Sequence, residues 1–198
     1  YILDSLNRWS APKTSRGWVK NAAKLRVKLL EDVYFKGLPK SIYSGPAKPV
    51  WGKTIQTGRG YLIRKVRFEG YPGMWIPGLL YEPTCLKGKV PVVLNPNGHH
   101  AGGKAMDYKQ ARCINLAKRG MIAFNTEFVG MGELTRDRDH QRIAHIDLCG
   151  VAGVSVFYLA MKRALDVLLS HPNADPGRVA MTGLSGGGWQ TAVLSATD

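Results

Sequence analysis

The sequence has the length and composition of an ordinary globular protein. It contains 198 residues, of which 44% are hydrophobic and 21% are charged, which is enough apolar material for a sizeable core. No apolar run reaches the ~18 residues that a membrane-spanning helix needs, and the longest candidate covers only Val151–Met161. These values exclude a disordered chain, and we expect no membrane partner.

The chain carries a formal net charge of +14. Such an excess suits an acidic partner such as nucleic acid, a membrane surface or an acidic polysaccharide. The basic residues are spread from Lys13 to Arg178, however, without a stripe interleaved with aromatic residues, so we expect no nucleic acid. Compensating acids in an absent C-terminal part are the alternative. The start at Tyr1, with no charged and then apolar leader, looks like a cut or mature end.

Three cysteines, an odd number at irregular spacing, indicate neither a disulfide framework nor a zinc site. We expect Cys85, Cys113 and Cys149 to be buried free thiols.

The first half of the chain predicts one helix and then a set of strands. Trp18, Ala22 and Leu25 recur at helical spacing within Arg16–Phe35, and Gly37 ends that helix. Alternating apolar residues, turns and a continuous apolar run then predict strands. The expected strands are Ile55–Gly70 with a break at Gly58–Gly60, Met74–Tyr81 and Val90–Asn95.

The second half alternates helices and strands. Alternation of this kind predicts a parallel sheet with right-handed crossovers and helices on both faces. The expected elements are the helix Ala105–Arg119, the strand Met121–Asn125, a polar loop over 129–145, the helix Val151–Ser170, the strand Arg178–Thr182 and the helix Gly188–Ala196. We therefore predict an α/β fold, a mainly parallel sheet with antiparallel first strands. We expect residues 1–50 to form an N-terminal helical extension and residues 51–198 to form the front part of a domain whose later strands lie beyond Asp198.

Ser185 is the candidate nucleophile. It lies in the motif Gly183-Leu184-Ser185-Gly186-Gly187, between a predicted strand and a predicted helix. A strand, a serine on a sharp turn and a helix form the nucleophile elbow of serine hydrolases, and the flanking glycines let strand and helix pass closely. A phosphate-binding loop is the alternative, but no lysine follows the glycines and the dinucleotide spacing is absent.

The loop after the Val90–Asn95 strand is the second half of the predicted site. A serine nucleophile needs donors for the oxyanion that forms when it attacks a carbonyl. The backbone amide of Gly186 is one candidate, and that of His99 is the other because Gly98 allows a tight turn before it. We expect His100 and Trp189 to contact substrate. A plain strand-to-helix turn is the alternative for this loop.

No histidine follows Ser185, although this architecture orders its triad serine, acid, histidine. His171 precedes Pro172, and we expect it at the surface. His140 and His145 share the polar loop with Asp139 and Asp147, but their spacing matches no metal-ligand pattern, so we predict no metal. Asp166 lies within a helix, where a solvated or capping role is expected. We therefore expect the catalytic acid and histidine beyond Asp198, and we expect this piece alone to be poorly soluble and inactive.

The chain resembles the α/β-hydrolases of the acetyl xylan esterase-like kind. The resemblance rests on Asn173–Thr191 around the elbow, on Pro72–Pro83 and on Gly120–Glu133, and it covers roughly residues 60–198. It implies an α/β-hydrolase fold, here truncated after the elbow helix. It also implies a serine esterase that cleaves acetyl or similar acyl groups, often from carbohydrate, through an acyl-enzyme without a cofactor. A secreted or periplasmic location is slightly favoured.

Two positions depart from that family pattern. Members often read His-Gly-His where this chain has Asn97-Gly98-His99, and Glu127 stands near where an aspartate is common. Two other functions remain open. One is a serine peptidase of the prolyl-oligopeptidase type, which the short helical N-terminus disfavours. The other is a non-catalytic binding module that keeps the fold without the triad.

Overall fold

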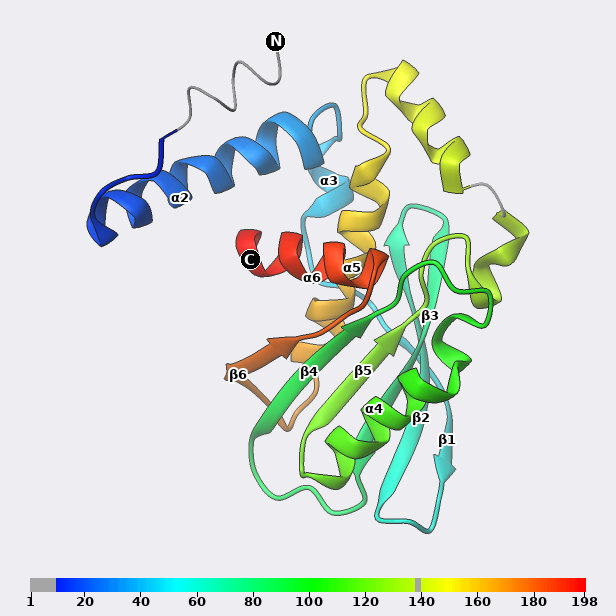
Figure 1. Ribbon diagram of the computed structural model, residues 1–198. Helices are drawn as coiled ribbons and strands as arrows, with labels where there is room; N and C mark the ends of the chain where they lie inside the picture. Colours follow the sequence, from blue (N-terminus) through cyan, green and yellow to red (C-terminus); the bar gives the residue numbers. More distant parts are fainter. Residues whose placement is uncertain (1–9, 138–139) are drawn as a thin grey trace.

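One mixed sheet of six strands organises the part of the chain that the computed structural model describes, residues 10–137 and 140–198. The strands lie in the order β1-β2-β3-β5-β4-β6 (Figure 1). Their bounds are β1 Val50–Gln56, β2 Tyr61–Tyr71, β3 Met74–Pro83, β4 Val90–Pro96, β5 Ile122–Thr126 and β6 Ala174–Met181.

The pairing of the strands changes along the chain as the sequence predicted. The first three strands pair antiparallel through tight turns, and β3 pairs antiparallel with β5. By contrast, β4 pairs parallel with both β5 and β6. Parallel neighbours need a crossover connection, which α4 (Asp107–Lys118) and α5 (Val154–Leu169) supply.

Helices cover both faces of the sheet. In Figure 1, α4 lies in front of the strands, whereas α5 lies behind them beside α6 (Gly186–Thr197). The larger core cluster lies between the sheet and α5, and it includes the fully buried Phe68, Phe124 and Leu168. A smaller cluster under α4 contains Tyr81 and Cys113. Because both faces of the central strands are covered, β5 is buried at every position.

Helices precede the sheet, as predicted. The predicted helix Arg16–Phe35 forms as α2 (Ser15–Leu29) followed by one π-helical turn, η1 (Leu30–Tyr34), and a short helix α3 (Lys40–Tyr43) comes next. The Thr14 side chain caps α2 by accepting a hydrogen bond from the Gly17 amide. Tyr34 stacks on Tyr158 of α5, with the ring centroids 4.4 Å apart. The η1 turn is thereby packed on the α5 side of the sheet, whereas α2 has no buried residue.

The connection between β5 and α5 differs from the plain loop that we predicted. It contains 3-10 helical turns, η3 (Gly132–Asp137) and η4 (His140–Cys149), and a further short turn, η2 (Gly103–Ala105), precedes α4. Backbone groups in a connection without strand partners still need hydrogen bonds, and short i→i+3 turns supply them locally. The sequence of this stretch has no strong helical period, which is why the prediction was wrong.

The cysteines also differ from the prediction. All three are free, but only Cys113 is buried, whereas Cys85 and Cys149 are exposed. Within the described residues, no single helix is long and apolar enough to cross a membrane, although Arg142–Cys149 and Val154–Leu169, bent by 105° against each other, pass that test as a pair.

Candidate active site

Ser185 lies on the turn between β6 and α6, with a strained backbone. Its φ of 56° and ψ of −123° make it the one non-glycine residue with a positive φ among the residues described. Such a conformation costs about 1–3 kcal/mol and persists only where the surroundings enforce it. Here a Cβ on Gly183 would lie 2.3 Å from the Gly187 carbonyl oxygen. The glycines therefore let β6 and α6 approach closely around the serine, as the motif predicted.

The loop Asn97–His99 packs directly against this turn. A Cβ on Gly98 would lie 2.7 Å from the Gly186 nitrogen and 2.9 Å from the Leu184 oxygen. Gln190 of α6 donates a hydrogen bond from Nε2 to the Asn97 carbonyl oxygen at 3.0 Å, which ties the loop to the elbow helix. Glycine at position 98 is therefore required by a backbone-to-backbone contact.

Gly186 and His99 line one cavity together with Ser185. Gly186 is the first residue of α6, and the amides of a first helical turn have no acceptor within their own helix. The positive end of the helix dipole adds to the attraction for a negative oxygen at this point. The two predicted donors are thus brought together with the predicted nucleophile, although their role remains a prediction.

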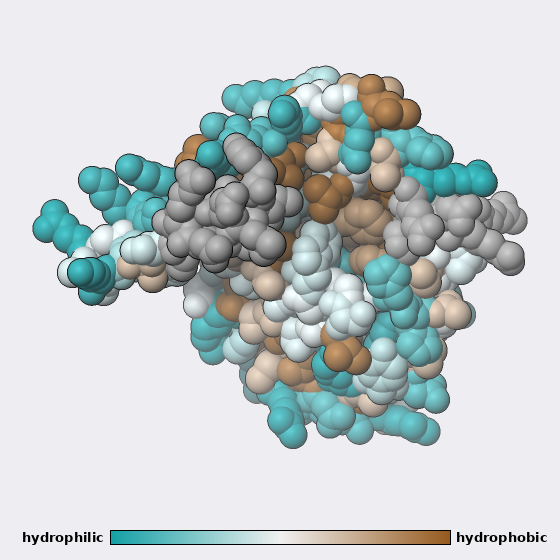
Figure 2. All heavy atoms as spheres, turned by 45° about the horizontal axis from the view of Figure 1, so that its top comes forward, coloured by the Kyte–Doolittle hydropathy of each residue, from teal (hydrophilic) through white to brown (hydrophobic). Residues whose placement is uncertain are grey.

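The cavity beside Ser185 has a volume of about 510 Å³ and a largely apolar wall. Four rings form a continuous row, with centroid distances of 5.0 Å for His99–Phe128, 5.3 Å for Phe128–Phe157 and 6.5 Å for Phe157–Trp189. Figure 2, which brings the top of Figure 1 forward, shows apolar residues gathered in the middle of this face with hydrophilic residues around them. Trp189 lines this cavity, and its contact with substrate remains a prediction.

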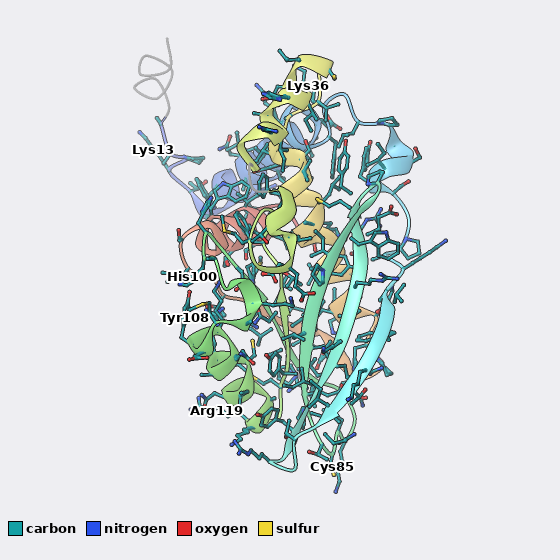
Figure 3. The ribbon with its side chains drawn as sticks, turned by 90° about the vertical axis from the view of Figure 1, so that its right-hand side faces the viewer. Lys13, Lys36, Cys85, His100, Tyr108 and Arg119 are labelled. Carbon is teal, nitrogen blue, oxygen red and sulfur yellow. The ribbon has the colours of Figure 1, made fainter. Side chains whose placement is uncertain are left out.

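His100 lies outside the cavity. Its ring meets that of Tyr108 on α4, with centroids 6.1 Å apart, and Figure 3 shows the two residues as neighbours on the α4 side of the molecule. It is exposed, and it does not belong to the residues that line the cavity beside Ser185. A substrate contact by His100 remains a prediction.

His171 is buried, which contradicts the predicted surface position. Its side chain is 4% exposed, and its Nε2 lies 2.7 Å from Oε2 of Glu82, which is also buried. The Asn173 amide donates a hydrogen bond to Nδ1 at 3.1 Å. The prediction failed because Pro172 suggested an exposed turn, while the partner Glu82 comes from a strand far earlier in the chain. This pair lies at the sheet end away from Ser185.

The other candidate acids and histidines have no metal-binding arrangement in the described residues. No group of three or more His, Cys, Asp or Glu side chains could hold an ion within 10–137 and 140–198. Asp139 lies outside the described residues, and His145 is exposed. Asp147 lines the cavity and accepts a hydrogen bond from the Gly153 amide at 2.6 Å. Asp166 pairs with Lys162 at 2.6 Å on α5.

A buried polar network under the Asn97–His99 loop was not foreseen. Asn97 Nδ2 donates to Asn125 Oδ1 at 2.7 Å, and Asn125 Nδ2 donates to the Lys104 carbonyl oxygen at 3.0 Å. Lys104 in turn pairs through Nζ with Glu127 Oε2 at 2.8 Å, and both side chains are buried. In the sequence, only Glu127 could have indicated this network, because a carboxylate that directly follows a buried strand needs a hydrogen-bond or ion-pair partner.

The family is decided by comparison of the sequence with known families. The acetyl xylan esterase (AXE1) family model matches residues 54–198. The chain belongs to the acetyl xylan esterase family. Among curated proteins, no sequence matches it significantly.

Solved structures share the fold. Methylesterase BT1017 is 24% identical, with a TM-score of 0.77, and the alignment covers 100% of this chain and 42% of that one. An acetyl xylan esterase from Paenibacillus sp. R4 is 22% identical, with a TM-score of 0.65 and coverages of 90% and 54%. Acetyl xylan esterase 1 from Thermoanaerobacterium sp. JW/SL YS485 is 15% identical, with a TM-score of 0.60 and coverages of 96% and 58%.

These comparisons confirm the predicted α/β-hydrolase fold and esterase family. The chain spans about half the length of the solved structures that it matches.

Proposed function

We propose that this chain contributes the nucleophile and the oxyanion site of a serine esterase. One observation carries the proposal: Ser185 holds a positive φ at a strand-to-helix turn, where the Gly98 loop touches the Gly186 amide. A serine on such a turn is presented at the tip of the sheet, beside backbone donors. The apolar cavity next to it offers space for the substrate.

The proposed reaction has two halves. The Ser185 oxygen attacks the ester carbonyl carbon while a histidine takes its proton, and the amides of Gly186 and His99 hold the oxyanion of the tetrahedral intermediate. The carbon–oxygen bond to the alcohol then breaks, and the histidine returns the proton to the leaving alcohol. Water hydrolyses the acyl-enzyme by the same route. We assign the histidine and its acid to a part of a longer polypeptide outside residues 1–198.

The substrate that we propose is a carbohydrate ester carrying an acetyl or similar acyl group. The family description names acetylated xylan, and one neighbour is named a methylesterase. Acetylated xylan releases acetate, whereas a methyl ester releases methanol. Measuring both products from one enzyme sample decides which bond is cleaved, and release of methanol without acetate would contradict the acetyl assignment.

A covalent probe tests the nucleophile. The longer polypeptide carrying this chain, together with its Ser185→Ala and Ser195→Ala variants, is incubated with a fluorophosphonate. Ser195 is the matched control because it lies exposed on α6 outside the cavity. We expect labelling of Ser185 by peptide mass, loss of labelling in Ser185→Ala and unchanged labelling in Ser195→Ala. Folded protein that takes no label at Ser185 would overturn the proposal.

A further inference from the structure

Glu127 is a buried carboxylate that accepts three hydrogen bonds. It lies directly after β5 and is 4% exposed. Its Oε1 accepts a hydrogen bond from the Lys104 amide at 2.8 Å, and its Oε2 accepts from Lys104 Nζ at 2.8 Å and from the Glu133 amide at 3.3 Å. One side chain thus binds the backbone of two loops, the one after β4 and the one after β5.

The two loops are shaped around this carboxylate. A Cβ on Gly103 would lie 1.9 Å from Glu127 Oε1, and a Cβ on Gly132 would lie 2.4 Å from its carboxyl group. Both glycines also have positive φ values, of 51° and 54°. Side chains at these positions would therefore occupy the space that the Glu127 carboxylate fills. The loops also meet each other, since the Gly132 amide donates to the Ala101 carbonyl oxygen at 3.3 Å.

The segment that carries the His99 amide is fixed at both ends by this arrangement. At its start, Asn97 donates from Nδ2 to Asn125 and to the Thr126 carbonyl oxygen at 2.6 Å. At its far end, Glu127 holds the Lys104 amide, and Lys109 Nζ donates to the Gly103 carbonyl oxygen at 3.0 Å. His99 lies between these two anchors, and Gly98 presses on the elbow.

We propose that Glu127 is a positioning residue for the oxyanion site: with Lys104 it fixes the far end of the 98–104 segment, and so sets where the His99 amide points. A buried ion pair by itself adds little net stability. This pair differs from a simple structural one because its carboxylate binds backbone amides of the loops beside the nucleophile. The inference rests on the proposed function, since the oxyanion site has a role only if Ser185 is the nucleophile.

The decisive variant replaces the whole pair. The double variant Lys104→Met/Glu127→Leu keeps the buried volume. Replacing a buried ion pair in this way is often neutral for folding, but here the buried Lys104 amide also loses its acceptor, so some loss of unfolding free energy is expected. The variant removes the carboxylate that accepts hydrogen bonds from the Lys104 and Glu133 amides. We expect a folded enzyme whose kcat for p-nitrophenyl acetate falls on the order of 100-fold, because small displacements of a catalytic donor have effects of that size. KM should stay within about threefold, since the anchor does not touch the cavity.

Single variants supply the matched comparison. Glu127→Gln keeps the shape of the side chain but loses its charge, and it should lower kcat in the same direction. Glu133→Gln makes the same chemical change at a side chain that is 67% exposed and that contacts Lys104 but not the 98–104 backbone. We expect less than about a threefold change there.

Amide hydrogen exchange gives a readout independent of turnover. In the double variant, exchange of the amides of residues 98–104 should rise about tenfold or more, while exchange of the α5 amides stays unchanged. A double variant with unchanged kcat and unchanged exchange would overturn the role of Glu127 while leaving the proposed function intact. If the wild-type enzyme took no label at Ser185, both the role of Glu127 and the proposed function would be ruled out.

Discussion

The Lys104–Glu127 pair and the His171–Glu82 pair lie at opposite ends of the same sheet. Glu127 follows the carboxyl end of β5, whereas His171 precedes the amino end of β6. A strand of eight residues such as β6 spans roughly 25 Å, so an acid and a histidine at the amino end are far from Ser185. Both pairs are buried, but one binds the loop beside the proposed nucleophile and the other binds the turn before β6. Residue type alone therefore does not distinguish a catalytic acid–histidine pair from a structural one.

The largest effect is expected where the loop after β4 meets the turn that carries Ser185. Gly98→Ala places a methyl group 2.7 Å from the Gly186 nitrogen, which forces the loop away from the elbow. We predict a loss of kcat of about 100-fold or more, with a loss of about 1–3 kcal/mol in unfolding free energy. Gly52→Ala is the control, because its Cβ would meet Lys65 at an ordinary 3.5 Å. If Gly98→Ala and Gly52→Ala had equal kcat values, the prediction that close packing at Gly98 is needed for activity would be wrong.

At the opposite end of the sheet, a substitution should lower the unfolding free energy and leave activity unchanged. His171→Ala leaves the buried Glu82 carboxylate without its 2.7 Å partner. We predict a loss of about 1–3 kcal/mol in unfolding free energy, measured by urea denaturation. Activity per folded molecule, titrated with the fluorophosphonate, should remain at the wild-type value. A fall in kcat that exceeds the unfolded fraction would show that the two ends are coupled.

Cys113 lies between the two ends, on the α4 face. Burial raises the pKa of its thiol to about 12, whereas an unfolded cysteine titrates near 8.5. The stability that the neutral thiol contributes is therefore complete below about pH 8.5 and is lost as the pH rises toward 12, because the unfolded chain releases its proton first. Between pH 8.5 and 9.5, the wild-type unfolding free energy should fall by about 1 kcal/mol more than that of Cys113→Ala. Parallel curves would contradict the prediction.

The smallest effect is expected at the rim of the cavity. Trp189 is 39% exposed and contacts Phe157 edge-on. Trp189→Ala should raise KM for an ester substrate by about threefold and leave kcat nearly unchanged, because the ring offers apolar contact but no group that reacts. Steady-state kinetics decide this, with Trp75→Ala, an exposed tryptophan outside the cavity, as the control. A fall in kcat without a change in KM would contradict the assignment.

Most elements and the elbow could be predicted because their signals are local. Apolar runs bounded by turns marked β3, β4 and α5 to within a few residues, and the glycines around Ser185 marked the turn. The pairs Glu82–His171 and Lys104–Glu127 could not be predicted, because each joins residues that only the sheet topology brings together. The 3-10 turns of η4 were missed because their hydrogen bonds need no hydrophobic period.

At Ser185, the proposed catalytic role of the side chain and the stability of the backbone have opposite requirements. A positive φ costs a residue with a side chain about 1–3 kcal/mol, whereas glycine adopts it freely and loses about 0.5–1 kcal/mol through its more flexible unfolded state. Selection for stability alone would therefore favour glycine at this position and remove the serine. If Ser185 is the nucleophile, as we propose, an inactive Ser185→Gly protein that unfolds at a higher temperature than the wild type would show that only catalysis maintains this serine.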